Sequence, residues 1–167
     1  MKLLKDIVLL MLPLFLMYGC KQDEWMDWKL ENELWLRQNG QSDAVRTTPT
    51  GLQYRVLYQG NEYDAKPSNG SVVVMDYSLR LINGIEVDNS KGVSMTVTKY
   101  DGTTGSGLID GFVEGLKRMN VGGDYVLYVP WELGYGKDGG AATEQSSSFI
   151  PPYSTLIFTI HLSSVNR

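Results

Sequence analysis

A segment near the C-terminus combines residue types that suit the binding of an uncharged, apolar guest. Residues 136–158 read GKDGGAATEQSSSFIPPYSTLIF, a loop rich in glycine and serine that leads through Ile-Pro-Pro into an alternating strand pattern. Tyr135 stands directly before this segment, between two glycines, and Tyr77 belongs to a separate strand pattern. Aromatic side chains, a loop and an apolar edge beside a sheet are typical of a cleft for an apolar ligand rather than for a phosphate or a metal ion.

The other residues with chemical potential do not form a catalytic or metal-binding set. The single histidine, His161, falls on the polar face of the last strand pattern, so no base stands beside a nucleophile. One histidine and one cysteine cannot supply a zinc site, and the glycines of residues 102–107 are not followed by the lysine of a phosphate-binding loop. A net charge of −4 without a basic cluster argues against nucleic acid as a partner. We therefore expect no metal or other cofactor, and a site that works by shape and desolvation.

Strands are the main elements that must position these residues. Apolar and polar residues alternate in five segments, as in half-buried strands: 52–57, 71–81, 93–98, 125–129 and 155–163. Asn83-Gly84 predicts a hairpin turn in which both residues can take a positive φ, and the chain returns from Ile85 to Asp88. Residues 110–119 have the apolar face of a short helix that Asp110 could cap. The pattern predicts an α+β fold, an antiparallel sheet with a helix laid against it.

Residues 23–38 contain the only long helical pattern after the first 20 residues. Trp25, Trp28 and Trp35 lie roughly along one stripe of this helix, which Asn39-Gly40 is expected to end. The stripe predicts that the helix packs on its own domain. A homodimer contact through this N-terminal helix and a stalk near a membrane are the alternatives.

The first 19 residues have the features of a secretory signal, with two lysines before an apolar run too short to span a bilayer. Cys20, the single cysteine, follows a small residue, which resembles the lipobox of a bacterial lipoprotein although Met17 replaces the usual leucine. That resemblance implies cleavage before Cys20, lipid attachment to it and anchoring in the cell-envelope membrane. An ordinary signal peptide or an uncleaved anchor is the alternative. We predict a signal at 1–19, an arm and linker at 20–50 and one domain at 51–167.

Several short motifs occur in one order within residues 51–165. They are Gly51-Leu-Gln-Tyr54, Val74-Met-Asp-Tyr77, Leu108-Ile-Asp-Gly-Phe112, Leu133-Gly-Tyr-Gly136, Ile150-Pro-Pro152 and Thr155-Leu-Ile-Phe158. Together they resemble the FK506-binding-protein family of peptidyl-prolyl isomerases. The resemblance implies a twisted sheet of five to six strands wrapped around one short helix. It also implies rotation of Xaa-Pro bonds in proline-containing polypeptides during folding outside the cytoplasm, and binding of a macrolide of the FK506 type.

The resemblance further implies roles for individual residues of a proline pocket. Its aromatic walls and floor are expected from Tyr77, Phe158 and Phe112. Asp88 is expected to project into the cleft as a hydrogen-bonding group. Ile109 would offer its backbone N–H, and Tyr135 its phenol, to carbonyl groups of the guest. The remaining contacts of the pocket are expected from Val87, Met95, Leu108, Phe149 and Ile150.

Two positions depart from the family pattern, since Phe112 stands where the family usually has tryptophan and Val87 where it usually has phenylalanine. These departures predict a wider, more aliphatic pocket. They motivate a rival function, a weakly catalytic or non-catalytic module that binds proline-containing or unfolded segments as a chaperone. A second rival is an adhesin-like structural lipoprotein whose tryptophan-rich helix is the working surface. On pattern alone, the aromatic residues could also be plain core.

Overall fold

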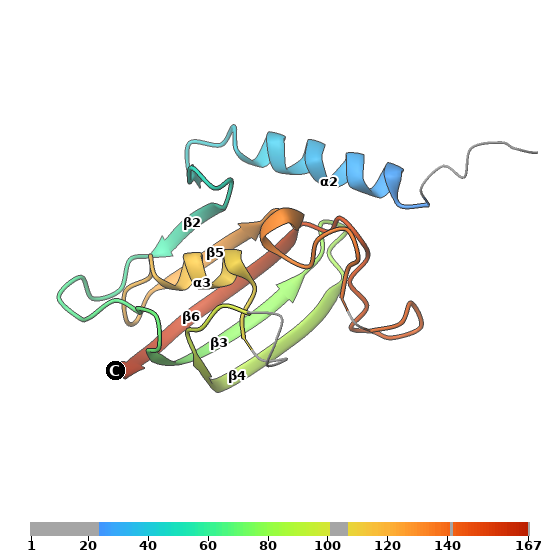
Figure 1. The fold of residues 1–167 in the computed structure, drawn as a ribbon. Coiled ribbons are helices and arrows are strands. Elements are labelled where there is room, and N and C mark those ends of the chain that lie inside the picture. Colours follow the sequence, from blue (N-terminus) through green and yellow to red (C-terminus); the bar gives the residue numbers. More distant parts are fainter. Residues whose placement is uncertain (1–23, 101–106, 141, 167) are drawn as a thin grey trace, which may run out of the picture.

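The computed structural model describes residues 24–100, 107–140 and 142–166, and Figure 1 shows their arrangement. Over these ranges the chain forms two α-helices, a short 3-10 helix and six strands. In chain order they are α2 (Met26–Asn39), β1 (Arg46–Thr47), β2 (Gln53–Tyr58), β3 (Val72–Arg80), β4 (Glu86–Thr96), α3 (Asp110–Leu116), β5 (Asp124–Val129), η1 (Trp131–Leu133) and β6 (Leu156–Asn166).

The strands form one antiparallel sheet in the order β1-β2-β5-β6-β3-β4, which confirms the predicted α+β architecture. The last strand, β6, lies between β5 and β3, so the C-terminal segment is central to the sheet. Alternate side chains of β6 are buried, as its pattern predicts: Leu156, Phe158, Ile160 and Leu162. His161 points to the opposite, exposed side, where its Nδ1 lies 2.7 Å from a carboxylate oxygen of Asp124. It is a surface residue, as expected.

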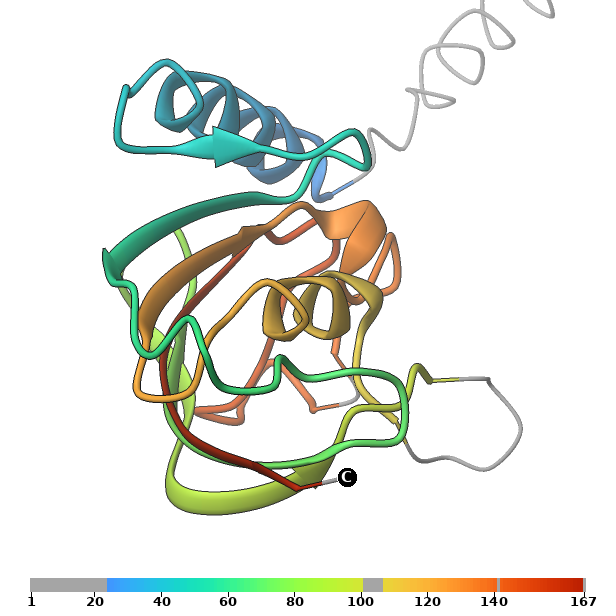
Figure 2. The ribbon, with the colours of Figure 1, turned by 90° about the vertical axis from the view of Figure 1, so that its left-hand side faces the viewer.

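Helix α3 lies in the hollow of the curved sheet, as Figure 2 shows. Its apolar residues are almost fully buried in the core: Phe112, Val113 and Leu116. The helix approaches the sheet closely because two of its positions are glycine. A side chain at Gly115 would collide with Leu127, and one at Gly111 with Val129. The closeness of α3 to β5 thus depends on the absence of side chains at these two positions.

Helix α2 packs on the domain that follows it. The ring of Trp35 lies against Tyr128 with 5.7 Å between ring centroids. Asn39 Nδ2 donates to Gln53 Oε1 at 2.9 Å, and Gln53 Nε2 donates to the Leu36 carbonyl at 3.0 Å. These contacts confirm the helix and show that its inner face is occupied by its own domain. The homodimer through this helix stays a prediction.

The hairpin between β3 and β4 differs in detail from its prediction. Leu81 N–H bonds to the Ile85 carbonyl and Gly84 N–H bonds to the Leu81 carbonyl, which makes a three-residue loop. Only Gly84 takes a positive φ, at 84°, whereas Asn83 does not and instead accepts from Ile85 N–H through its side chain. The predicted turn is present, and of the two residues that can take a positive φ only Gly84 uses it.

Two further expectations about local structure need correction. Residues 86–88 and 93–96 of the two predicted segments are parts of one strand, β4, whose pairing with β3 has irregularities. Helix α3 ends at Leu116 rather than at residue 119, and Asp110 is its first residue, without a capping bond. Asp110 pairs instead with Lys99 at 3.1 Å, and the cap position belongs to Ile109. The ion pair with Lys99, in the segment after β4, thus takes the carboxylate away from the helix backbone.

The predicted signal, Cys20 and its lipid lie outside the described residues, as do residues 101–106 of the glycine-rich loop. Across the part of the chain that the structure describes, no helix has the length and apolar character needed to cross a membrane.

Candidate active site

A cavity of about 1030 Å³ opens where the start of α3 meets β3, β4 and the loop after β5. Eight of the predicted site residues line it: Tyr77, Asp88, Met95, Leu108, Ile109, Phe112, Tyr135 and Phe158. They come from five separate parts of the chain, so only the tertiary fold brings them together. A smaller cavity of about 460 Å³ between α2 and β2 contains none of the predicted residues. We therefore take the larger cavity as the candidate site.

Three aromatic rings form the base of this cavity. The rings of Phe112 and Phe158 have centroids 4.6 Å apart, and that of Tyr77 lies 6.1 Å from Phe112 and 6.3 Å from Phe158. Phe112 and Phe158 are only 4 % and 5 % exposed. Tilted and edge-on arrangements at these separations are the favoured geometries of aromatic pairs. The base is thus a rigid apolar surface, supplied by α3, β3 and β6.

Asp88 supplies a charged group at the side of this aromatic base. The hydroxyl of Tyr77 donates to Asp88 Oδ2 at 2.6 Å. Leu79 pairs with Asp88 and Arg80 with Glu86, so Val87 is an extra residue on β4. This bulge lets Val87 enter the core while its neighbour Asp88 still lines the cavity. Bulges commonly redirect side chains in this way beside functional sites.

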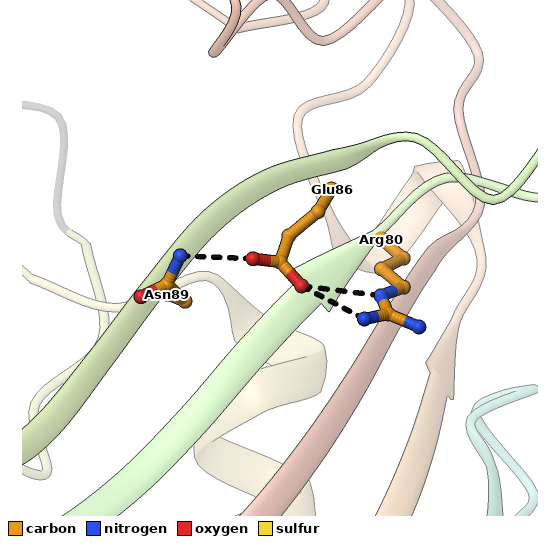
Figure 3. Close-up of polar contacts among 3 residues, drawn as sticks. All are labelled: Arg80, Glu86 and Asn89. Atoms are coloured by element: carbon orange, nitrogen blue, oxygen red, sulfur yellow. Dashed lines mark hydrogen bonds and ion pairs between the residues drawn. The ribbon is translucent and has the colours of Figure 1, made fainter.

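A polar network spans the bulge on the exposed side of the hairpin, and Figure 3 shows it. Arg80 donates to Glu86 Oε2 through Nε at 3.2 Å and through Nη2 at 3.0 Å. Asn89 Nδ2 donates to Glu86 Oε1 at 2.9 Å. These bonds connect the residues that flank Val87 and Asp88 with the facing strand. Because the side chains are exposed, the network contributes little stability, but it restrains the geometry of the bulge.

The N-terminus of α3 and the loop after β5 contribute hydrogen-bond donors to the cavity. Among the described residues, none accepts a hydrogen bond from the backbone N–H of Ile109, which precedes the helix. On the other side, Tyr135 is 44 % exposed and follows η1. Gly136 takes a positive φ of 69° and returns its N–H to the Trp131 carbonyl at 2.9 Å. This turn presents Tyr135 to the cavity.

Both tyrosines of the site remain protonated at neutral pH. Burial, followed by the hydrogen bond to Asp88 and its negative charge, raises the pKa of Tyr77 far above the ordinary value. Partial burial and then the charge of Asp88 raise the pKa of Tyr135 as well. Both effects have the same cause, because a phenolate would lose water and face a carboxylate. The site therefore offers phenolic donors rather than a base.

Three predicted site residues do not line the cavity. Val87 and Ile150 are buried in the core, 6 % and 7 % exposed. Phe149 packs instead against Trp25, the residue before α2, with 6.0 Å between ring centroids. The displacement of Val87 follows from the bulge, and that of Phe149 from the contact with Trp25. Neither cause is visible in the local sequence.

Other lining residues were missed by the sequence reasoning. They are Leu79, Tyr100, Gly107, Asp110, Glu132, Leu133, Gly134, Gly136, Asp138, Gly139 and Gly140. Several of them flank Tyr135, so the Leu-Gly-Tyr-Gly motif could have indicated them. Tyr100 is 55 % exposed at the edge of the cavity and has no such signal.

The arrangement can bind an apolar group and hold polar groups at its edge. The base is apolar, with Phe112 and Phe158 almost fully buried, whereas Asp88, the Ile109 N–H and Tyr135 surround it. Across the described residues, no three histidine, cysteine or acidic side chains gather in a way that could hold a metal ion. Nothing in this geometry supplies a nucleophile next to a base. The site can therefore favour a weakly polar group over a polar one, without forming a covalent bond.

Comparisons with known proteins agree with this geometry. The family model of the FKBP-type peptidyl-prolyl cis-trans isomerases matches residues 63–163. The FKBP-type 22 kDa peptidyl-prolyl cis-trans isomerase of Escherichia coli K12 is 34% identical over 134 residues, which cover 79% of this chain and 58% of the relative. The outer membrane protein MIP of Legionella longbeachae is 30% identical over 139 residues, covering 83% and 54%.

A solved structure supports the same assignment. The crystal structure of FkpA from Escherichia coli aligns with a TM-score of 0.71 at 33% identity, covering 84% of this chain and 60% of that one. The chain spans about half the length of the curated relatives that it matches, 45% and 58% in two of them. The family match covers the strands and the helix that build the cavity. The chain therefore belongs to the FKBP-type peptidyl-prolyl cis-trans isomerase family.

Proposed function

We propose that this chain is a peptidyl-prolyl cis-trans isomerase that assists the folding of proline-containing polypeptides. The observation that carries the proposal is the closed aromatic base of Tyr77, Phe112 and Phe158 with hydrogen-bonding groups around it. Membership of the family supports the same reaction.

The reaction suits a site without a nucleophile. Rotation about an Xaa-Pro bond has a barrier of ~18–20 kcal/mol because it breaks amide resonance. The cis and trans forms differ by only ~0.5–1 kcal/mol, so a catalyst has only to lower the barrier. The twisted amide has lost its dipolar resonance form and is less polar than the planar amide. A dry aromatic cavity stabilises it more than the planar ground state, and this difference in binding is the catalysis.

In this proposal each group has a distinct task. The proline ring lies on Phe112 between Tyr77 and Phe158, with Met95 and Leu108 as aliphatic contacts. The Ile109 N–H and the Tyr135 hydroxyl donate to carbonyl groups that flank the proline and hold the chain while the amide rotates. Asp88 fixes Tyr77 through their hydrogen bond and places a negative charge beside the guest. Val87, Phe149 and Ile150 support the cavity from behind.

A cis/trans assay on an Xaa-Pro peptide tests this proposal. The protein is expected to accelerate isomerisation, and a macrolide of the FK506 type is expected to inhibit it by occupying the same cavity. An uncatalysed rate in the presence of the folded protein would overturn the isomerase assignment. Macrolide binding without acceleration would favour the rival binding module. The rival was motivated by two departures from the family pattern, Val87 and Phe112. Because Val87 does not line the cavity, only Phe112 still supports the rival.

We also propose that the protein works at the cell envelope, held by a lipid on Cys20. The signal-like first 19 residues support this location, and one relative is named an outer membrane protein. Its clients would then be polypeptides that fold outside the cytoplasm. Replacement of Cys20 by alanine should move the protein from the membrane to the soluble fraction of cells. An unchanged distribution would exclude this anchor.

A further inference from the structure

Helix α2 holds the chain segment that leads into β6. Asn32 is completely buried and is the only buried residue of the helix. Its Nδ2 donates to the Trp28 carbonyl at 2.8 Å, and its Oδ1 accepts from the Thr155 N–H at 2.7 Å. Thr155 is 1 % exposed and directly precedes β6. A buried amide with both functions satisfied fixes the relative position of the two segments.

A second connection runs from Trp28 to the same segment. Its indole Nε1 donates to Ser154 Oγ at 3.0 Å, and Ser154 Oγ donates in turn to the Pro151 carbonyl at 2.7 Å. Lys29 adds a cation over the Tyr153 ring, 5.1 Å from its centroid. The N-terminal half of α2 thus contacts residues 151–155 through the side chains of Trp28, Lys29 and Asn32. Figure 1 shows this half of α2 nearest to the loop between β5 and β6.

The segment held by α2 forms the back of the cavity wall. The Tyr153 N–H donates to the Gly136 carbonyl at 3.0 Å, and the Gly140 N–H donates to the Ile150 carbonyl at 2.9 Å. Gly136 and Gly140 both line the cavity. Gly139, between them, lies so close to the Ile150–Pro152 backbone that a side chain there would collide with it. Movement of this segment would therefore move the wall that follows Tyr135.

The backbone of Tyr153 shows that this segment needs external support. Among the described residues it is the one non-glycine residue with a positive φ, at 59°. Side chains other than glycine adopt that conformation at an energetic cost, so the surroundings must hold it. Its neighbours Ser154 and Thr155 are the residues bonded to Trp28 and Asn32. The helix thus supports the strained position from the side away from the cavity.

We propose that Asn32 and Trp28 are positioning residues of the isomerase site. They act through residues 150–155 on the wall formed by residues 134–140, and so on the placement of Tyr135. The N-terminal helix then helps to set the geometry of the site and is not only a connecting arm. This inference rests on the proposed isomerase function for its catalytic readout, but its structural readout is independent of catalysis.

The test uses full-length protein with the variants Trp28→Phe and Asn32→Ala. Trp28→Phe keeps an aromatic side chain at this position and removes the indole N–H that reaches Ser154, together with the rest of the five-membered ring. Leu30→Ala is the matched control, because Leu30 lies on the same helix and is 55 % exposed. Asn39→Ala is a second control that removes a contact between α2 and β2, far from residues 150–155.

Two measurements decide the outcome. We expect Asn32→Ala and Trp28→Phe to lower kcat/KM about tenfold, since small displacements of positioning groups are costly, and to weaken macrolide binding. We also expect amide hydrogen exchange at Tyr153 and Gly140 to accelerate about tenfold in the same variants and not in either control. All measurements are made well below the melting temperature of each variant.

The possible results separate the two proposals. Unchanged exchange at Tyr153 and Gly140 in Trp28→Phe and Asn32→Ala would overturn the positioning role, whatever the activity. Equal changes of kcat/KM and of amide exchange in the Leu30→Ala and Asn39→Ala controls would also overturn the positioning role. The effect would then come from the general packing of the helix on the domain. Absence of isomerase activity in the unaltered protein would overturn the proposed function, while accelerated exchange would still support the link from α2 to the wall.

Discussion

The hydroxyl of Tyr77 and the carboxylate of Asp88 lie 2.6 Å apart and join β3 to β4 beside the aromatic base of the cavity. In the register of the two strands Tyr77 faces Ser90, so Asp88 is its diagonal neighbour. Diagonal neighbours on one face are within reach of a long aromatic side chain. The bond orients the Tyr77 ring and restrains the charge of Asp88, so the two residues should act as one unit.

Double substitution tests this unit. We expect Tyr77→Phe and Asp88→Ala each to lower kcat/KM about tenfold, because each removes a group of the same hydrogen bond. The double variant should be no more than slightly worse than either single one, since the shared interaction can be lost only once. Steady-state isomerisation of an Xaa-Pro peptide measures all three.

Tyr58→Phe is the control for this series, because Tyr58 lies on β2, is 64 % exposed and does not line the cavity. Its kcat/KM should equal that of the unaltered protein. Fully additive losses of kcat/KM in the double variant would show that Tyr77 and Asp88 act independently, which would contradict their action as one unit.

Much of the site could be predicted once the alternation was combined with the resemblance of the local motifs to the family. Tyr77 and Phe158 stand at inward positions of strand patterns, and the period of two places their side chains on the inner face. Tyr135 stands in a glycine-flanked turn whose conformation follows from its neighbours. These are features of short range. For that reason the sheet, α3 and the aromatic base agree with the expectations.

The remaining features depend on contacts between distant segments. Val87 leaves the cavity because a bulge inserts it into the pairing of β4 with β3, and nothing in its own segment marks the extra residue. Phe149 turns toward Trp25, more than 100 residues away in sequence. Asn32 reads as an ordinary polar helix residue until its partner Thr155 is seen. Periodicity describes faces of single elements and cannot reveal such pairings.

Removal of the Tyr135 hydroxyl should reduce catalysis without affecting the fold. The residue is 44 % exposed at the cavity. Tyr135→Phe should therefore lower kcat/KM about tenfold through loss of one hydrogen bond to the guest. Its free energy of unfolding should stay within about 0.5 kcal/mol of the unaltered value. Urea denaturation and the peptide assay together check this. A large loss of stability would show that the Tyr135 hydroxyl stabilises the folded state.

The close approach of α3 to β5 makes a strong prediction about stability. Alanine at Gly115 would collide with the side chain of Leu127, which is completely buried. The cost of overpacking, about 1–3 kcal/mol, should exceed the helix propensity gained from alanine, about 1 kcal/mol. Gly115→Ala should thus lower the free energy of unfolding in urea denaturation.

A second substitution distinguishes overpacking from other causes. In the double variant Gly115→Ala/Leu127→Val, the smaller valine should make room for the added methyl group. It should therefore cost less than the sum of the two single variants. Simple additivity would show that the methyl group at position 115 does not meet Leu127, contrary to the packing of α3 described above.

Glu114 should make stability depend on pH in the acid range. Thr50 Oγ1 donates to Glu114 Oε2 at 2.6 Å, and Arg118 Nη2 donates to Oε1 at 3.1 Å. Burial alone would raise the pKa of Glu114, but the hydrogen bonds from Thr50, Thr48 and Arg118 and the charge of Arg118 outweigh it and lower the pKa. The folded state therefore binds the proton less readily than the unfolded state does.

The sign of the pH effect follows from this lowered pKa. The stabilisation is fully present above the ordinary glutamate pKa of about 4.3 and is lost as the pH falls through the lower folded value. Glu114→Gln should reduce the free energy of unfolding by about 1 kcal/mol at pH 7, and the difference from the unaltered protein should shrink below about pH 4. Urea denaturation across this range measures it. If Glu114→Gln has the same pH dependence of stability as the unaltered protein, the contacts of Glu114 with Thr50 and Arg118 do not govern acid stability.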